Sequence, residues 1–211
     1  MCSEVAEDII ATKVNIYGPR GVSYKDGSAG SSGNTRGRLP LYNLFNFIQV
    51  TSWNSYLSNY SINYALGAYL SRTYGPSLFT DIVRNGESGT SAIETAIGNN
   101  TTFGEVLYNW AIANVLSDDL NTQSLYRYNS GDWTSETVND ITYNLGSINL
   151  FNYQYGSQEG PYFHNVDELD GISQQPPHSN LYAYLGRYSG RIEGQISYTD
   201  GTQIILIAKD Q

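Results

Sequence analysis

The chain has 211 residues with 20 acidic and 11 basic side chains, which give it a formal net charge of −9 at pH 7. It has neither a basic run nor a run of roughly 18 apolar residues, so its composition argues against nucleic-acid binding and against a membrane-spanning helix. The single cysteine, Cys2, excludes a disulfide within the chain, and the 40% hydrophobic residues suffice for a core.

The first residues predict an amphipathic helix. Its apolar positions recur at helical spacing and are Cys2, Val5, Ala6 and Ile9. The acidic residues of this stretch fall mostly on the other faces of the predicted helix. No N-cap residue precedes the helix, so the sequence opens without a helix start signal. Cys2 is expected to be a small core residue rather than a reactive thiol.

Residues 18–38 contain the string GSAGSSGNTRGR and predict a long flexible loop, because Gly and Ser offer little surface to bury. The whole chain is rich in uncharged polar residues and holds 19 Tyr and 21 Gly, a profile typical of secreted or surface-exposed bacterial proteins. We therefore expect an extracellular or cell-surface location. The first four residues, MCSE, do not resemble a signal peptide, so an export signal would lie outside this sequence.

Residues 61–117 predict four successive helices, each with an apolar face at helical spacing. Ser91 with Glu94 and Thr102 with Glu105 match the capping-box pattern, in which two side chains satisfy the first backbone N–H groups of a helix. These two pairs predict the starts of the third and fourth helices.

The rest of the chain predicts β structure. Residues 121–177 are rich in Tyr, Asn and Gly without a helical face, which indicates irregular structure with short strands. Residues 181–188, 191–198 and 202–208 predict three strands, the last two joined by a tight Asp-Gly turn. The apolar run within 202–208 suits a buried strand. We expect these strands to form a small antiparallel sheet.

Together these elements predict an α+β fold in two parts. Residues 1–120 form the helical part, which includes the flexible loop, and residues 121–211 form an irregular, β-rich module. The length fits one domain or two small ones.

The sequence offers no self-sufficient active site. It contains no HExxH motif, no GxSxG motif and no phosphate-binding glycine loop. Its two histidines, His164 and His178, lie in predicted loops and lack the spacing of a zinc site. Ordinary loop histidines explain them most simply, and an unfamiliar hydrolase site near His164 is the alternative.

The helical region resembles a known family. The string NYSINYALGAYLSRTYG over 59–75, followed by LFTDIV and TTFGEVLYNWAIANVLSD, resembles the part of gluzincin-type zinc metallopeptidases that follows the zinc site, and above all the hyicolysin family. Ala6-Glu7-Asp8 is similar to the continuation of the helix that carries the third zinc ligand in those families. SNLYAYLG and QIILIAKD more loosely resemble the closing β segment. The resemblance implies that residues 1–120 form the C-terminal half of a gluzincin catalytic domain.

The resemblance also implies site residues. Tyr64, in the string YALG, aligns with a tyrosine that hydrogen-bonds the oxyanion of the tetrahedral intermediate in aminopeptidase-like relatives, and Tyr60 is the alternative. Aromatic packing would explain either tyrosine equally well. Glu4 and Glu7 align with carboxylates that orient a zinc-bound histidine or brace the helix in relatives. A solvated helix face is the alternative for both.

The absence of an HExxH motif determines which activity we expect of this chain. Without the zinc-binding histidines and the general base, we expect no peptidase activity and no bound zinc in this chain alone. The resemblance implies a fragment or remnant of a secreted peptidase, whose complete form would bind zinc and hydrolyse peptides or proteins. An N-terminal half with the zinc motif would precede Met1 and be a partner of this chain. The alternative is an exported binding or structural module that recognises glycans or proteins.

Overall fold

The computed structural model of the protein describes residues 1–14, 18–21, 37–128, 133–169, 172, 175–187 and 201–208. Within these residues the chain forms helices and several small sheets, which confirms a mixed α and β architecture. No helix in these ranges is both long and apolar enough to cross a lipid bilayer. Most of the predicted loop over 18–38 lies outside the described residues.

Among the described residues, six helices form the main body of the molecule. They are α1 (Cys2–Val14), α2 (Arg38–Leu44), α3 (Leu57–Tyr74), α4 (Ser77–Arg84), α5 (Gly89–Ile97) and α6 (Phe103–Leu116). The four helices predicted over 61–117 are confirmed as α3 to α6, and α3 begins four residues earlier than predicted. The predicted N-terminal helix is confirmed as α1. Helix α2 has no counterpart among the predicted helices.

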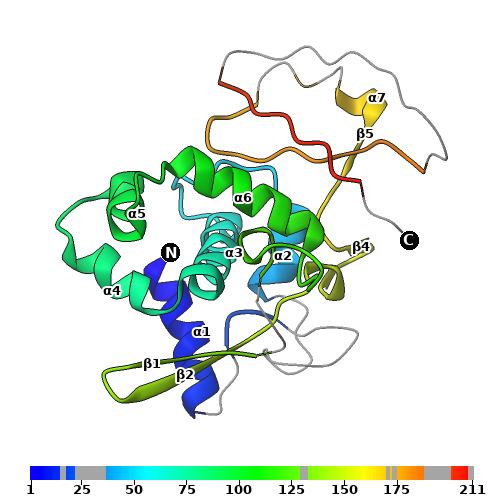
Figure 1. Ribbon diagram of the computed structural model, residues 1–211. Coiled ribbons are helices and arrows are strands. Elements are labelled where there is room, and N and C mark those ends of the chain that lie inside the picture. The colour runs from blue at the N-terminus through cyan, green and yellow to red at the C-terminus, as the bar shows by residue number, and fades with distance from the viewer. Residues whose placement is uncertain are drawn as a thin grey trace.

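Helix α3 lies at the centre of this body and contacts α1, α2, α4 and α6 (Figure 1). A helix with neighbours on several sides must be largely apolar or small around its circumference. Most residues of α3 are accordingly buried, including Tyr64, Leu66 and Tyr69. On the neighbouring helices, the rings of Tyr42 and Trp110 stack with their centroids 5.7 Å apart. The core is therefore rich in aromatic side chains.

The described β structure consists of three two-stranded sheets. The strands are β1 (Trp133–Val138), β2 (Ile141–Gly146), β3 (Gln154–Tyr155), β4 (Gln158–Glu159), β5 (His164–Asn165) and β6 (Ala183–Tyr184), and a short helix, α7 (Val166–Leu169), follows β5. β1 and β2 form an antiparallel hairpin whose turn residues, Asn139 and Asp140, both have positive φ. Asn and Asp tolerate this conformation best among residues with a side chain, which explains the tight turn. β5 and β6 pair in parallel.

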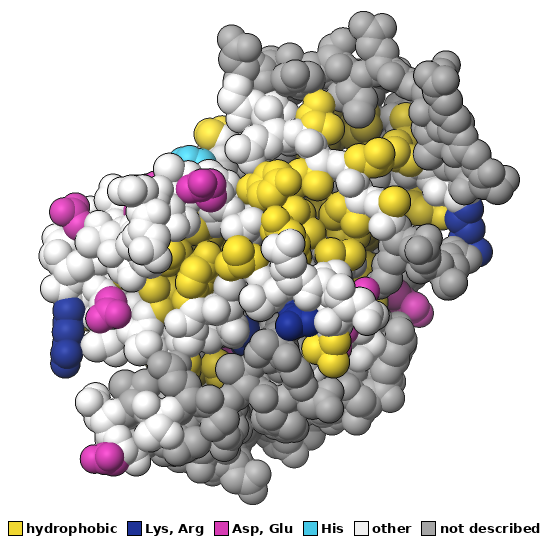
Figure 2. All heavy atoms as spheres, in the orientation of Figure 1, with side chains coloured by type: hydrophobic (Ala, Val, Ile, Leu, Met, Phe, Trp, Pro, Cys, Tyr) yellow, Lys and Arg dark blue, Asp and Glu magenta, His cyan; other side chains and the backbone are white. Residues whose placement is uncertain are grey.

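The predicted closing antiparallel sheet is wrong where the structure can test it. Within 181–187, the described part of the first predicted strand, only Ala183–Tyr184 is a strand, and residues 202–208 form none. The second predicted strand, 191–198, lies outside the described residues. Ile204 and Leu206 are exposed, and a hollow beside α6 is lined by Ile205, Leu206 and Ile207. Figure 2 shows hydrophobic side chains gathered across this face of the molecule. The apolar run within 202–208 thus lies beside α6. Its β pattern gave no indication of this position.

One of the two predicted capping boxes is confirmed. Thr102 Oγ1 accepts the Glu105 backbone N–H at 3.2 Å, and Glu105 Oε2 accepts the Thr102 N–H at 2.7 Å, at the start of α6. The Ser91 and Glu94 box is wrong, because α5 begins two residues before Ser91. Glu94 instead accepts the Phe103 backbone N–H at 2.7 Å. It therefore satisfies a donor at the start of the next helix.

Replacing Gly67 by Ala is expected to destabilise the protein. A Cβ at this position would lie 2.2 Å from Val5 Cγ2 and 3.0 Å from Met1 Cγ, where α1 approaches α3. We expect the overpacking to cost about 1–3 kcal/mol, which outweighs the gain of roughly 1 kcal/mol from better helix propensity. Urea unfolding measures the change. Gly104→Ala on α6 is the matched control, because its Cβ would meet only Thr102 Oγ1 at 3.8 Å. An equal stabilisation by both substitutions would contradict the close approach.

Candidate functional site

Two of the predicted site residues converge on one arginine. Glu4 from α1 pairs with Arg38 at the start of α2, with 2.6 Å between Glu4 Oε2 and Arg38 Nε. The guanidinium carbon of Arg38 also lies 5.1 Å from the ring centroid of Tyr60 on α3. Glu4 is buried and Arg38 remains partly exposed. The alternative of a solvated helix face is therefore wrong for Glu4, which braces α1 against α2.

An exposed tryptophan completes this group. The rings of Trp53 and Tyr60 meet edge to face with their centroids 4.7 Å apart. Trp53 lies in the segment before α3, and more than half of its surface is exposed. We call Glu4, Arg38, Trp53 and Tyr60 the Arg38 site. Because α1, α2 and α3 each contribute a residue, the site depends on how these three helices pack.

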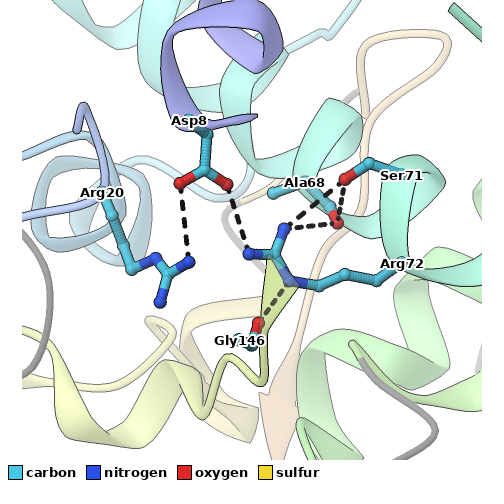
Figure 3. A network of polar contacts seen from close by, with 6 residues as sticks. All are labelled: Asp8, Arg20, Ala68, Ser71, Arg72 and Gly146. Atoms are coloured by element: carbon cyan, nitrogen blue, oxygen red, sulfur yellow. Dashed lines mark hydrogen bonds and ion pairs between the residues drawn. The ribbon is translucent and has the colours of Figure 1, made fainter. Parts of the chain in front are cut away.

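Tyr64 lies in a different environment, next to a buried ionic cluster. The carboxylate of Asp8 pairs with Arg20 at 3.5 Å and with Arg72 at 3.2 Å (Figure 3). Arg72 also donates from Nε to the Gly146 carbonyl at 2.7 Å, which ties α3 to the end of β2. Asp8, Arg20, Tyr64 and Arg72 form what we call the Asp8 cluster. All four residues are buried.

In the Asp8 cluster, the acidic and basic side chains stabilise each other's charged forms. Burial alone would raise the pKa of Asp8, but Arg20 and Arg72, with the Tyr64 hydroxyl beside them, outweigh it and hold the pKa below its ordinary value of 3.8. Burial would lower the pKa of Arg20, but the Asp8 carboxylate outweighs it and raises that pKa. Burial, followed by the charge of Asp8, raises the pKa of Tyr64. The cluster therefore consists of one carboxylate, two guanidinium groups and a protonated phenol.

The structure places the four predicted site residues in different environments. Tyr64 is 0% exposed, so its phenol packs inside the molecule, whereas Tyr60 is partly exposed. Glu7 lies on the exposed side of α1, away from Glu4 and Asp8 on the buried side. Ala6 is also exposed, which corrects its predicted place on the core face. The structure thus brings together Glu4 and Tyr60, and places Tyr64 in the adjoining core.

The arginines of both groups were not predicted from the sequence. Residues 39–71 contain no Asp, Glu, Lys or Arg, so Arg38 and Arg72 are the charged residues that flank a long neutral segment. An arginine beside a core helix needs an acidic partner if it is buried. The position of Arg38 and Arg72 at the two ends of this neutral segment was therefore the sequence signal for buried ion pairs. The pattern does not reveal which acid each arginine meets, because both partners lie on α1, far away in sequence.

The described residues do not fit a zinc site. No three His, Cys, Asp or Glu side chains among them gather closely enough to hold a metal ion. His164 Nδ1 lies 3.4 Å from Glu168 Oε2, and His178 Nδ1 lies 3.0 Å from Thr51 Oγ1. The carboxylates of Glu4 and Asp8 are held by arginines. We therefore derive no reaction step through a metal held by these residues.

Comparison with known proteins adds no relative. No protein-family model, no curated protein and no solved structure matches the chain. The chemistry of the Arg38 site therefore follows from its own residues. They offer a partly exposed phenol, an arginine neutralised by Glu4, and an exposed indole ring. A group without a histidine, a thiol or an unpaired carboxylate suits binding and polarisation of a ligand rather than proton abstraction.

Proposed function

We propose that this chain forms the helical wall of the active-site cleft in a hyicolysin-like zinc metallopeptidase. Polypeptide outside these residues would carry the HExxH motif and hold the zinc. The proposal rests on the family-like strings in the helical region, and the convergence of Glu4 and Tyr60 on Arg38 supports it. Glu4 and Tyr60 come from α1 and α3, two of the segments that carry the family-like strings.

The geometry favours Tyr60 over Tyr64 as the residue that contacts substrate. A phenol can stabilise the negative charge that develops on a carbonyl oxygen only if it reaches that oxygen. Tyr60 is partly exposed at the Arg38 site, whereas Tyr64 is enclosed beside Asp8. Glu4 acts as a positioning residue, because it holds Arg38 against the ring of Tyr60.

The first test compares the chain with a longer polypeptide. We expect the purified chain alone to hydrolyse no fluorescently labelled casein in the presence of zinc. The same chain joined to the polypeptide encoded directly upstream should hydrolyse it. In that longer protein, Tyr60→Phe should lower kcat by roughly 10²-fold or more with little change in KM. Tyr155→Phe, at an exposed tyrosine of β3, is the matched control.

Two results would overturn this proposal. One is an upstream coding sequence without an HExxH motif. The other is a Tyr60→Phe enzyme whose kcat equals that of the Tyr155→Phe enzyme.

A second candidate is a binding or structural module without catalytic activity, exported to the cell surface. The exposure of Trp53, Tyr56 and Leu57, each more than half accessible, favours it. Peptide hydrolysis by the longer polypeptide would exclude this candidate, whereas ligand binding without any hydrolysis would support it. The extracellular or cell-surface location remains a prediction from composition.

A further inference from the structure

A hollow beside α6 is lined largely by polar and aromatic side chains. Its volume is about 570 Å³, within the range of roughly 300–1,000 Å³ that is usual for ligand pockets. Its walls include the end of α3, the turn between α5 and α6, α6 itself and the 3₁₀ turn η1 (Ser124–Tyr126). We call it the Tyr108 hollow, and its lining includes Tyr74, Asn99, Glu105, Tyr108, Asn109 and Gln203.

Most phenol and amide groups of this lining are free to bind a ligand. Five such side chains make no hydrogen bond within the described part of the chain, namely Tyr74, Asn99, Tyr108, Asn109 and Gln203. All of them are at least partly exposed, so a ligand can reach them. A phenol and a side-chain amide can each both donate and accept hydrogen bonds. The hollow therefore offers donors and acceptors from several elements at once.

Most of these side chains are carried by well-defined backbone. Tyr108 and Asn109 lie on α6. Asn99 has a φ of 55°, which asparagine tolerates, and the turn around it is closed by the Thr101 N–H, which donates to the Gly98 carbonyl at 3.0 Å. The hollow is therefore largely preorganised, which reduces the entropy lost on binding.

The charges at the hollow argue against an anionic ligand. Glu105 is the one charged residue among the described residues of the lining, and Glu105 Oε2 already accepts the Thr102 N–H at the start of α6. Arg127, which follows η1, donates from Nη1 to the Leu120 carbonyl at 2.8 Å and is not part of the described lining. A phosphate, sulfate or carboxylate group would therefore be desolvated in the hollow without a cationic partner.

The free groups fit a sugar better than an apolar peptide side chain. A pyranose ring carries hydroxyl groups around its rim, which both donate and accept, and C–H groups on its face. Phenols and amides match the hydroxyl groups, and aromatic rings pack against the C–H groups. An apolar side chain in the same place would desolvate the free phenols and amides without giving them partners.

A second hollow extends the first along α6. Its volume is about 670 Å³, and Tyr108 lines both hollows, so they adjoin at this residue. Tyr126 adds another aromatic ring. Asp119 is the one charged residue in the described lining of the second hollow, and its carboxylate accepts from the backbone and the side chain of Asn121 at 2.9 and 3.1 Å. The combined space suits several linked sugars rather than one.

We propose that the Tyr108 hollow binds a neutral oligosaccharide. The tyrosine rings pack against its C–H groups, and the free amides of Asn99 and Asn109 hydrogen-bond its hydroxyl groups. This inference goes beyond the proposed peptidase function and does not depend on it, because none of these residues belongs to the Arg38 site.

The test measures sugar binding by the whole chain with titration calorimetry. The neutral probes are cellotetraose, maltotetraose, mannotetraose and N-acetylchitotetraose, and the acidic probe is tetragalacturonate. We expect saturable binding of at least one neutral probe and none of the acidic probe. A hydrolysis assay is not involved, so failure of the peptidase proposal is scored separately.

Three variants locate the binding site. Tyr108→Ala should weaken binding of the neutral probe roughly tenfold or more. Asn109→Ala, at a partly exposed position of the same helix, should weaken it roughly two- to tenfold and decides the test if Tyr108→Ala unfolds the chain. Tyr155→Ala, at an exposed tyrosine of β3 that is not part of the described lining, is the matched control and should leave binding unchanged.

Other outcomes overturn the proposal. They are a lack of binding by every neutral probe, equal binding of tetragalacturonate, and binding that neither Tyr108→Ala nor Asn109→Ala weakens. Sugar binding that is lost in Trp53→Ala and kept in Tyr108→Ala would place the site at the exposed aromatic residues before α3 instead. Binding of a capped Gly-Phe-Leu-Gly tetrapeptide in place of the sugars, lost in Tyr108→Ala, would assign the hollow to polypeptides.

Discussion

Replacing Asp8 by Ala is expected to lower the free energy of unfolding by about 3–5 kcal/mol, because it leaves buried arginines without their shared counter-ion. Asp8 pairs with both Arg20 and Arg72, and the side chain of Arg72 is 0% exposed. These contacts join α1 to α3 and to the segment after α1. Urea unfolding followed by circular dichroism measures the change.

Two further variants separate charge from packing. Asp8→Asn keeps the shape of the side chain and removes the charge, so it should still cost about 3 kcal/mol if the ion pairs carry the effect. Glu7→Gln removes an exposed acid from the same helix and should change stability by no more than about 0.5 kcal/mol. A loss below about 1 kcal/mol for both Asp8 variants would show that the cluster contributes little to stability.

The same cluster predicts the pH dependence of stability. The pKa of Asp8 in the folded protein lies below its ordinary value of 3.8, so the unfolded chain takes up this proton first as the pH falls. The contribution of Asp8 is therefore complete above about pH 5 and is lost as the pH falls below about 4, towards the folded pKa. The difference in unfolding free energy between the protein and its Asp8→Asn variant should shrink between pH 7 and pH 3.

Replacing Asn114 by Ala is expected to lower the free energy of unfolding by about 2–4 kcal/mol, because two buried hydroxyl groups lose a partner. Tyr128 donates from its hydroxyl to Asn114 Oδ1 at 2.7 Å, and Asn114 Nδ2 donates to the Tyr182 hydroxyl at 2.7 Å. Trp110 Nε1 extends the chain by donating to Tyr128 at 2.8 Å. Burial raises the pKa of both tyrosines, so both remain protonated at neutral pH.

This network connects α6 to the segment around β6, so its loss should also loosen that segment. Limited proteolysis should cut the Asn114→Ala variant near Tyr182 earlier than the unaltered protein, in addition to the shift in urea midpoint. Asn109→Ala, at a partly exposed position of the same helix, is the control. A double-mutant cycle with Tyr182→Phe should show a coupling of about 0.5–3 kcal/mol, and strict additivity would contradict the network.

The helices could be predicted because their signals are local. Residues three and four apart share a helix face, so the apolar spacing in 61–117 predicted α3 to α6 without knowledge of the fold. The box of Thr102 and Glu105 was likewise local, because both of its hydrogen bonds join residues three positions apart. The box predicted at Ser91 failed because Glu94 caps the following helix, a contact between two elements.

The strands near the end of the chain were harder to predict. A β pattern shows that a segment could pair, but not with which segment or whether a partner is available. β6 pairs in parallel with β5, near residue 164, and residues 202–208 lie beside α6 without forming a strand. The Arg38 site could not be predicted for the same reason, because its members come from three helices and one loop that are separate in the sequence.

The amino-acid sequence alone determined the charge of the chain, the lack of an internal disulfide, the absence of an HExxH motif and the positions of most helices, because each depends on composition or on neighbouring residues. Only the tertiary structure decided that Glu4 and Asp8 are buried, that Tyr60 is accessible and that Tyr64 is not. Glu4 and Asp8 on α1 are buried because arginines outside this helix neutralise them there. Such pairing is long-range, and no local pattern on α1 records it.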